Sequence, residues 1–329
     1  MPRPILITGA TGGLGLSLVE AARAAGYDVL ATGRSATAVE RLTATGARFT
    51  RADLTDAAAL PALVKGQASV IHAAALSASW GRRADFEQVN VGATRMLIEA
   101  ARESGCSRFV FVSSPSIYAG FRDRLNIKGS DAPPRRQLSD YSRSKLRAEE
   151  LVRGADGPAM RTCAVRPRAI VGPDDKVLLP ALLAMAMRKR VLLPGGGAAL
   201  IELTDVRDAA RAILLAEEAI PVIGGRAINI SGGSARSVSD IARGLAAALG
   251  LSPRFVALPM IAGRAGALLA EAWASASGSA REPVLTRYAL ATLGFTQTFD
   301  AEEPARLIGY RPRHDAFATL LAQARRCRR

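Results

Sequence analysis

A glycine-rich turn near the start of the chain constrains its fold more than any other feature. The β-branched, apolar run at residues 5–8 leads directly into Gly9-x-x-Gly12-x-x-Gly15, where a helical pattern begins. A buried strand, a tight turn and a helix N-terminus are therefore predicted. Gly9 can take the turn, Gly12 lets a diphosphate approach the backbone, and Gly15 lets the helix lie close to the strand. Because a helix N-terminus also attracts anions, the position favours nucleotide binding over an ordinary glycine-rich turn.

Strand and helix patterns alternate through the first half of the chain. Strands are predicted near residues 4–8, 28–32, 47–52, 69–74, 108–113 and 161–166. Helices are predicted near residues 13–25, 36–45, 56–64, 84–104, 138–153 and 206–218. Such alternation is typical of the α/β class, and we expect a Rossmann-type, doubly wound parallel sheet covered on both faces. Ligands bind such sheets at the carboxyl ends of the strands.

The pattern changes after about residue 170, where proline and glycine cluster and the predicted elements become shorter. We expect a cofactor-binding Rossmann domain at residues 1–170, to which residues 201–228 return. Residues 171–200 and 229–329 are expected to form a smaller, mostly helical, C-terminal substrate lobe. Boundaries drawn from sequence patterns are uncertain by several residues.

The net charge of +15 raises the question of nucleic-acid binding. Arginine, spread along the whole chain, dominates this charge, and lysine supplies only five of the 44 basic residues (Lys65, Lys128, Lys145, Lys176 and Lys189). The short basic clusters have no interleaved aromatic residues and no nucleic-acid motif, so no specific nucleic-acid partner is expected. Attraction of anionic substrates or cofactors is the more useful consequence of the charge.

Cysteine and histidine are too few and too scattered for a disulfide framework or a zinc site. The three cysteines, Cys106, Cys163 and Cys327, show no paired spacing, which is typical of a reducing compartment. The two histidines, His72 and His314, are far apart in the chain, so no metal is expected.

Membrane insertion and secretion are not expected either. A predicted strand begins within the first few residues, which leaves no room for a signal peptide. The longest apolar stretch, residues 257–278, is interrupted by Arg264 and Glu271. It predicts a helix with one polar side, and packing within the substrate lobe is favoured over contact with a membrane surface. We therefore expect a cytoplasmic protein.

The ends of the second, third and fourth predicted strands indicate which cofactor the turn would bind. Enzymes that prefer NAD usually carry an acidic residue about 20 residues beyond the glycines, to hold the ribose 2′-hydroxyl. Here Arg34 stands at that place and could hold a 2′-phosphate, which favours NADP over NAD. The alternative explanation of Arg34 is an ordinary surface arginine exposed to solvent. Asp53 suits contact with the adenine or helix capping. His72 is as readily a packed histidine as a ligand contact, and the alanines after it let a cofactor pass closely.

A tyrosine and a lysine lie four residues apart in a predicted helix. Tyr141 and Lys145 therefore share one helix face. A phenol is a poor base at neutral pH, and a neighbouring lysine cation can lower its pKa by roughly 1–3 units. The pair is a candidate for proton transfer beside a hydride donor. Ser113 and Ser114 close the fifth predicted strand, where a hydroxyl could orient a substrate oxygen or simply stabilise the turn.

Taken together, these residues resemble the extended short-chain dehydrogenase/reductase family. The resemblance covers nearly the whole chain and rests on Thr8-Gly9-x-x-Gly12-x-x-Gly15, Asp53-Leu54, His72-Ala73-Ala74, Asn90-Val91-x-x-Thr94, Ser113-Ser114, Tyr141-x-x-x-Lys145, Arg166-Pro167 and Gly309-Tyr310-x-Pro312. It implies that Ser114 positions the substrate oxygen, Tyr141 transfers a proton, and Lys145 supports Tyr141 and the nicotinamide ribose. The implied cofactor-binding residues are Thr8, Gly9, Thr11, Gly12, Gly13, Leu14, Gly15, Arg34, Asp53, Leu54, Ala73, Ala74, Tyr141, Lys145 and Pro167.

Further motifs resemble the branch of 3β-hydroxysteroid dehydrogenases, which includes bacterial 2-alkyl-3-oxoalkanoate reductases. They are Trp80-Gly81 through Asn90-Val91, Arg166-Pro167-x-x-Ile170-x-Gly172-Pro173-x-Asp175 and Leu285-Thr286-Arg287-Tyr288. The resemblance implies a dehydrogenase or reductase that interconverts an alcohol and a ketone on a hydrophobic substrate, of the steroid or long-chain β-keto acid type. It also implies a homodimer through the helices near 84–104 and 138–153.

Two alternatives remain open. Family dehydratases carry an Asp-Glu pair where this chain has Pro115-Ser116, which argues against dehydration. Nucleotide-sugar epimerisation needs only the serine, tyrosine and lysine, and therefore survives, although apolar segments such as residues 178–183 favour an apolar cleft. A protein that binds NADP without turnover is a minor alternative, because such relatives typically lose the tyrosine or the lysine.

Overall fold

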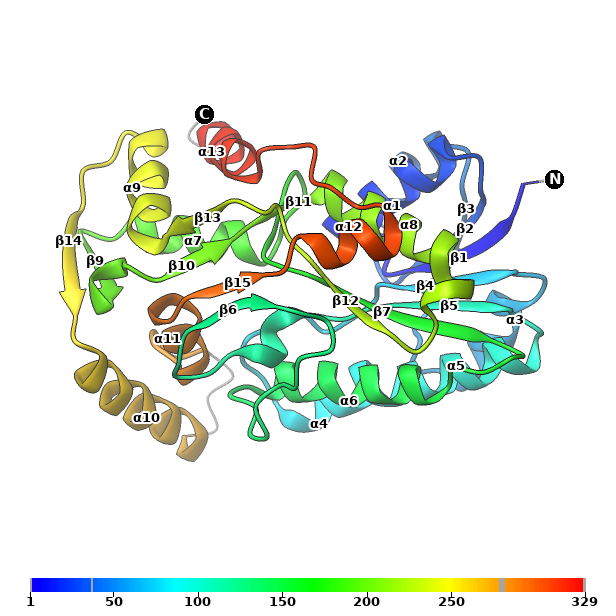
Figure 1. The fold of residues 1–329 in the computed structure, drawn as a ribbon, viewed down its shortest axis with the longest axis horizontal. Helices are drawn as coiled ribbons and strands as arrows, with labels where there is room; N and C mark the ends of the chain where they lie inside the picture. Colours follow the sequence, from blue (N-terminus) through cyan, green and yellow to red (C-terminus); the bar gives the residue numbers. More distant parts are fainter. Residues whose placement is uncertain (1, 37, 278–281, 328–329) are drawn as a thin grey trace.

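A seven-stranded parallel sheet forms the centre of the protein. The structure is a computed structural model, and it describes residues 2–36, 38–277 and 282–327. The strand order is β12-β7-β5-β4-β1-β2-β3 (Figure 1). The strands are β1 (Pro4–Thr8), β2 (Asp28–Gly33), β3 (Arg48–Arg51), β4 (Ser69–His72), β5 (Arg108–Val112), β7 (Arg161–Pro167) and β12 (Ala227–Ile230). The order reverses between β1 and β4, and such a switch point is where open α/β sheets bind ligands.

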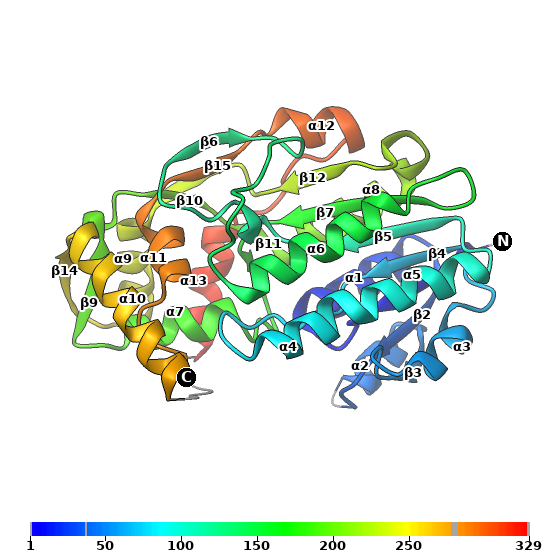
Figure 2. The ribbon, with the colours of Figure 1, turned by 90° about the horizontal axis from the view of Figure 1, so that it is seen from below.

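Helices cover both faces of this sheet, as the alternating pattern predicts (Figures 1 and 2). One face carries α1 (Gly13–Ala24), α2 (Val39–Ala44) and α8 (Val206–Ile223), and the other carries α3 (Leu60–Val64), α4 (Arg83–Phe86), α5 (Ala93–Glu103) and α6 (Asp140–Gly154). Within β1, Ile5 and Ile7 enter the core beneath α1 and α8, while Leu6 enters the core beneath α3 and α5. Alternate side chains thus serve opposite faces, which explains why the strand is apolar throughout.

The remaining elements form a second region around smaller sheets. A four-stranded sheet has the order β13-β10-β15-β6, and two strand pairs, β8–β11 and β9–β14, lie beside it. These strands are β6 (Arg124–Ile127), β8 (Ile170–Val171), β9 (Arg190–Pro194), β10 (Leu200–Glu202), β11 (Thr204–Asp205), β13 (Ala235–Ser237), β14 (Arg254–Leu258) and β15 (Gln297–Phe299). The helices that follow α8 in the chain are α9 (Val238–Leu249), α10 (Met260–Ala276), α11 (Arg287–Gly294), α12 (Glu302–Ile308) and α13 (Ala316–Cys327), and α7 (Leu178–Ala186) precedes them.

The predicted elements of the main sheet are present, with shifted boundaries. The helix expected near 84–104 is divided into α4, a π-helical segment over Glu87–Gly92, and α5. The side chain of Asn90 lies in this wider segment. Its Nδ2 donates to the Ser144 hydroxyl of α6 (2.9 Å), and its Oδ1 accepts from the Leu76 backbone amide (2.7 Å). These contacts hold the loop after β4 against α6.

Helix α8 runs to Ile223, five residues beyond the predicted end, although it contains Pro221. A proline cannot donate to the carbonyl four residues earlier, which here belongs to Glu217. Arg108 of β5 donates to that carbonyl instead (3.0 Å). A tertiary contact therefore replaces the missing helical hydrogen bond, which the local pattern could not reveal.

Helix α10 corrects the prediction of a helix with one polar side. Its outer face is apolar: Ile261 is 86% exposed, Leu269 70% and Trp273 73%. Its two charged residues face the protein, since Glu271 is buried against Arg287 and Arg264 stacks over the Phe121 ring. No helix in the described part of the chain is both long enough and apolar enough to span a membrane.

Candidate active site

The glycine-rich turn between β1 and α1 leaves no room for side chains at two of its positions. Gly9 has a φ of 70°, and a Cβ there would lie 2.6 Å from the Ala74 amide nitrogen. A Cβ on Gly15 would overlap the Gly9 carbonyl, so this glycine does allow the helix to lie against the strand. At Gly12 the nearest atom would be 3.5 Å away and the residue is exposed, which leaves its backbone open to a ligand.

His72 proves to be a packed, structural histidine. Its Nδ1 lies 2.7 Å from the Thr8 hydroxyl, and its Nε2 lies 2.9 Å from the Thr94 hydroxyl. The Thr94 hydroxyl donates its proton to the Asn90 backbone carbonyl, so it can only accept from the histidine. Nε2 therefore carries the ring proton, and Nδ1 accepts from the Thr8 hydroxyl. Burial, and secondarily the charge of Lys145, lowers the pKa of His72 to about 3. The ring is therefore neutral and links the ends of β1 and β4.

Two arginines gather where β2 and β3 end. Arg34 follows β2 and is exposed, and the Arg51 Nε of β3 donates to the Arg34 carbonyl (2.9 Å). Asp53 accepts from the amide and hydroxyl of Thr55 (3.0 and 2.8 Å), and these hydrogen bonds lower its pKa, with help from the charge of Arg34. Asp53 therefore stabilises its own turn. Arg51 was missed from the sequence because it lies in the strand rather than in a loop motif.

The other residues expected to contact a cofactor lie along the same edge of the sheet. Ala73 and Ala74 follow β4 and touch the turn at Gly9, while Thr11 packs against Gly33 at the end of β2. Leu54 is buried, whereas Gly13 and Leu14 begin α1. Pro167 ends β7 and pairs with β12.

Ser114 and Tyr141 come together at this edge, as the sequence predicts. Ser114 lies two residues beyond β5, and its hydroxyl accepts from the Ser116 amide (3.2 Å). Tyr141 lies in the first turn of α6, which begins after Ser139 because this hydroxyl accepts from the Ser142 amide (3.1 Å). The Tyr141 phenol forms hydrogen bonds with the hydroxyls of Ser114 and Ser77. Ser77 belongs to the loop that Asn90 holds, and no local motif marked it.

The expectation that Lys145 lowers the pKa of Tyr141 is wrong in this structure. Burial raises the pKa of Tyr141 to about 12, although the hydrogen bond with Ser114 opposes the rise. Lys145 instead donates to the Val112 carbonyl at the end of β5 (2.6 Å) and lies 4.0 Å from the centre of the Phe111 ring. Burial lowers the pKa of Lys145 to about 7, partly offset by Glu149. Tyr141 is therefore a neutral acid at physiological pH, held by hydroxyls rather than by a cation.

Tyr288 and Arg168 complete the polar surroundings of Tyr141. Burial raises the pKa of Tyr288, and the charge of Arg168 opposes this rise. The charge of an ionised Tyr288 would in turn raise the pKa of Tyr141, so Tyr288 lies within electrostatic range of both Tyr141 and Arg168. Tyr288 was noticed only as part of a family motif, and Arg168 only as an unnamed position within one.

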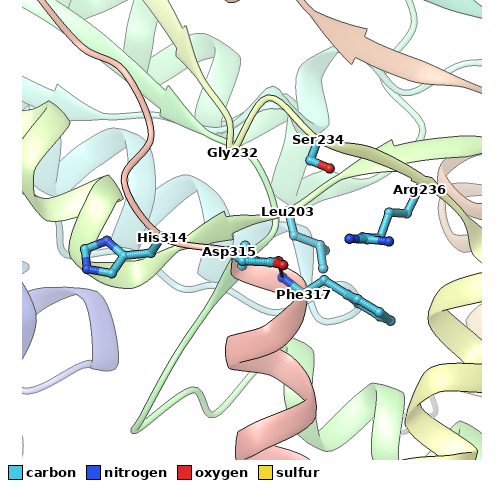
Figure 3. A pocket seen from close by; sticks show the side chains of 8 residues that line it. Leu203, Gly232, Ser234, Arg236, His314, Asp315 and Phe317 are labelled. Carbon is cyan, nitrogen blue, oxygen red and sulfur yellow. Dashed lines mark hydrogen bonds between the residues drawn. The ribbon is translucent and has the colours of Figure 1, made fainter.

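A separate cavity of about 260 Å³ lies apart from the catalytic candidates (Figure 3). Its lining comes from the segments before β11, after β12 and around the start of α13 (Leu203, Gly232, Ser234, Arg236, His314, Asp315, Ala316 and Phe317). Arg236 stacks over the Phe317 ring, and His314 lies 3.3 Å from the Asp208 carboxylate. No group of three or more side chains suited to a metal is found within the described ranges.

Residues 5–231 match the family model described as "NAD dependent epimerase/dehydratase family". A ketoreductase of a farnesyl-dihydroquinoline oxide from Stigmatella aurantiaca is 33% identical over 305 residues, covering 92% of this chain and 90% of the relative. A 2-alkyl-3-oxoalkanoate reductase from Stenotrophomonas maltophilia is 32% identical over 314 residues, covering 94% of each chain. Proteins named as 3β-hydroxysteroid dehydrogenases also match, in agreement with the expected branch.

A solved structure shares the fold along almost the whole chain. MoeE5, in complex with UDP-glucose and NAD, superposes with a TM-score of 0.76 and is 27% identical, covering 98% of this chain and 99% of its own.

Proposed function

The chain belongs to the NAD-dependent epimerase/dehydratase family and is an NAD(P)-dependent dehydrogenase or reductase, and we propose that it interconverts a secondary alcohol and a ketone on a hydrophobic substrate. The observation that carries this proposal is the contact of the Tyr141 phenol with Ser114, at the edge of the sheet onto which the glycine turn opens. This contact supports the roles proposed for the two residues, a proton donor and a hydroxyl that binds the substrate oxygen beside a nicotinamide.

The glycine turn fits the diphosphate of such a cofactor. The open backbone at Gly12 precedes the N-terminus of α1, whose first amides and dipole favour an anion. A nicotinamide supplies or accepts a hydride when it is bound. We propose NADP as the preferred form because Arg34 and Arg51 place two guanidinium groups at the ends of β2 and β3, where a 2′-phosphate would lie. NAD is the alternative, since the family model is named for it and MoeE5 was solved in complex with it.

The chemistry of reduction follows from the state of the side chains. The Ser114 hydroxyl donates to the carbonyl oxygen and orients it, while the neutral Tyr141 phenol gives that oxygen a proton as the carbonyl carbon is reduced. In the reverse direction the proton of the alcohol would pass to the phenolate form of Tyr141 as the hydride leaves the carbinol carbon for the oxidised cofactor. Lys145 is fixed on the Val112 carbonyl and keeps α6 against the end of β5. We propose that it also supports the nicotinamide ribose.

The proposal of a hydrophobic substrate rests on the names of the relatives. The reductases from Stigmatella and Stenotrophomonas are named for a farnesyl-bearing quinoline and for alkyl-substituted oxoalkanoates. Both names describe a ketone with a large apolar portion, and both proteins align with more than nine-tenths of this chain. We propose residues 1–170 with 201–228 as the cofactor-binding part, residues 171–200 and 229–329 as the substrate lobe, and a homodimer as the assembly.

Nucleotide-sugar epimerisation is the second candidate because MoeE5 was solved with UDP-glucose. The two functions make different demands, since a diphosphate needs several charged or backbone donors and an apolar chain needs a continuous apolar wall. A screen of the purified protein with NADPH and NADH, against hydrophobic ketones, steroids and UDP-sugars, tests the proposal. Turnover of apolar ketones supports it; micromolar binding and turnover of a UDP-sugar, with no response to ketones, overturns it.

A further inference from the structure

Two arginines near the end of β7 are buried in contrasting ways. Arg166 is 2% exposed and is neutralised by Glu149, to whose carboxylate its Nε and Nη2 donate, the former at 2.8 Å. Its Nη1 also donates to the Gly129 carbonyl (3.0 Å). This guanidinium is fully used by the protein, and burying a charge requires that kind of pairing.

Arg168, two residues later, is only 5% exposed but lacks such a partner. Among the residues that the structure describes, its Nε has no hydrogen-bond acceptor and no carboxylate lies within ion-pair distance of its guanidinium. Its charge is felt by Tyr288 and by the buried carboxylate of Glu202, which accepts from the Phe299 amide and forms no ion pair with Arg168. A buried guanidinium without a close counter-charge is costly unless something else supplies the acceptor.

The backbone fixes Arg168 at the catalytic edge. Its amide donates to the Ile230 carbonyl of β12 (2.8 Å), and its carbonyl accepts from the Thr204 hydroxyl. On the other side, β7 pairs with β5 in a register that matches Val165 with Val112. Arg168 therefore stands three residues beyond that pair on one strand, and Ser114 two residues beyond it on the neighbouring strand.

We propose that Arg168 binds a carboxylate of the substrate, so that the substrate is a hydrophobic hydroxy or oxo acid rather than a neutral ketone or steroid. A guanidinium pairs with a carboxylate through parallel N–H donors, and its strength increases where water is excluded. Tyr288 lies within electrostatic range of both Arg168 and Tyr141, so the guanidinium belongs to the same polar surroundings as the proton donor. One unpaired guanidinium suits a single carboxylate better than a diphosphate, which needs several donors.

The proposal rests on the proposed function and deepens it, and a matched pair of substrates tests it. The probes are 3-hydroxytetradecanoate and its methyl ester, oxidised with NADP or NAD by the full chain. We expect the wild type to have a kcat/KM for the acid at least about tenfold above that for the ester, because the ester lacks the charge. In Arg168→Gln the value for the acid should fall about 10–100-fold, mainly through KM, while that for the ester stays within about threefold. Arg168→Lys should recover part of the loss.

Arg188→Gln is the matched control, because it removes one exposed arginine of the same charge elsewhere in the lobe. It should leave both substrates unchanged. Equal kcat/KM values for the acid and the ester in the wild type would overturn the proposal, and so would an equal fall of both values in Arg168→Gln. Binding of UDP-glucose by a wild type that oxidises neither compound would overturn it as well.

A binding measurement separates this proposal from the proposed function. Calorimetry with tetradecanoate and tetradecanol reports the carboxylate contact without turnover. If neither hydroxy compound is oxidised but tetradecanoate binds more weakly to Arg168→Gln than to the wild type, the proposed function fails while the carboxylate site stands. If tetradecanoate and tetradecanol bind alike to the wild type, the carboxylate site fails.

Discussion

Replacing Tyr141 with phenylalanine removes one hydroxyl and leaves the ring in place. The hydroxyl contacts Ser114 and Ser77, and neither serine is fully buried, so water can take up the lost hydrogen bonds. We therefore expect the free energy of unfolding to change by less than about 1 kcal/mol. Cofactor binding should also persist, because the glycine turn and Arg34 do not depend on the phenol.

Turnover should nevertheless fall by about two to four orders of magnitude, the usual contribution of a positioned general acid. This corresponds to about 3–5 kcal/mol of activation free energy. Steady-state kcat, the dissociation constant of NADPH and the melting temperature are to be measured on both proteins. Ser77→Ala is the matched control, and its exposed hydroxyl should matter less than tenfold because water replaces it. Full activity in Tyr141→Phe would refute the assignment of the proton to this residue.

The pH profile examines the same reasoning from another side. Because burial raises the pKa of Tyr141 to about 12, the phenol stays protonated between pH 6 and 9. The rate of ketone reduction should therefore show no loss from ionisation of Tyr141 across that range. A phenol activated by Lys145 would behave differently, with a pKa below 10 and a reduction rate that falls as the pH approaches it.

Three other changes follow from the structure. Arg34→Asp should reverse a preference for NADPH over NADH, measured as the ratio of dissociation constants; equal affinities in the unmodified protein would contradict the role of Arg34. Burial lowers the pKa of Lys145 to about 7, so the unfolded chain binds one more proton than the folded chain between about pH 7 and 10.5. The wild type should therefore gain stability relative to Lys145→Met as the pH rises from 7 to 10, which denaturant midpoints would reveal. A difference in stability that does not change with pH would mean that the pKa of Lys145 is not lowered. Gly15→Ala should destabilise the protein by about 1–3 kcal/mol and weaken cofactor binding, because its methyl group would overlap the Gly9 carbonyl. Gly266→Ala, which meets no atom within 4 Å in α10, should stabilise the protein by about 0.5–1 kcal/mol, and the reverse order of the two melting temperatures would contradict this account.

Local pattern was sufficient to predict the central sheet except for its edge strand β12. An apolar run, a glycine turn and a helical period are all features of adjacent residues, and their alternation permits few arrangements other than a doubly wound sheet. The parallel order also dictates that the strands end at one edge, so the meeting of Ser114 and Tyr141 followed once the strand and the helix had been recognised. The roles of both residues remain proposals.

Ionisation could not be predicted in the same way, because it depends on what surrounds a group. The spacing of Tyr141 and Lys145 predicts a shared helix face, but only the tertiary structure directs Lys145 to the Val112 carbonyl and leaves Tyr141 with hydroxyl partners. Burial then moves both pKa values against the direction that a simple charge pair would give.

Neighbouring residues suffice to predict six of the seven strands, the glycine turn and the candidates within family motifs, but not β12, Arg51 or Ser77. The packing of remote segments settles which of the two arginines near the end of β7 is neutralised, because Glu149 reaches Arg166 from α6 and no carboxylate reaches Arg168 in the described part of the chain. It likewise brings Tyr288, more than a hundred residues away from either in the chain, into electrostatic range of Arg168 and Tyr141. Hydrogen bonds and charges act through space, and distances in space between remote segments are set only when the whole chain packs.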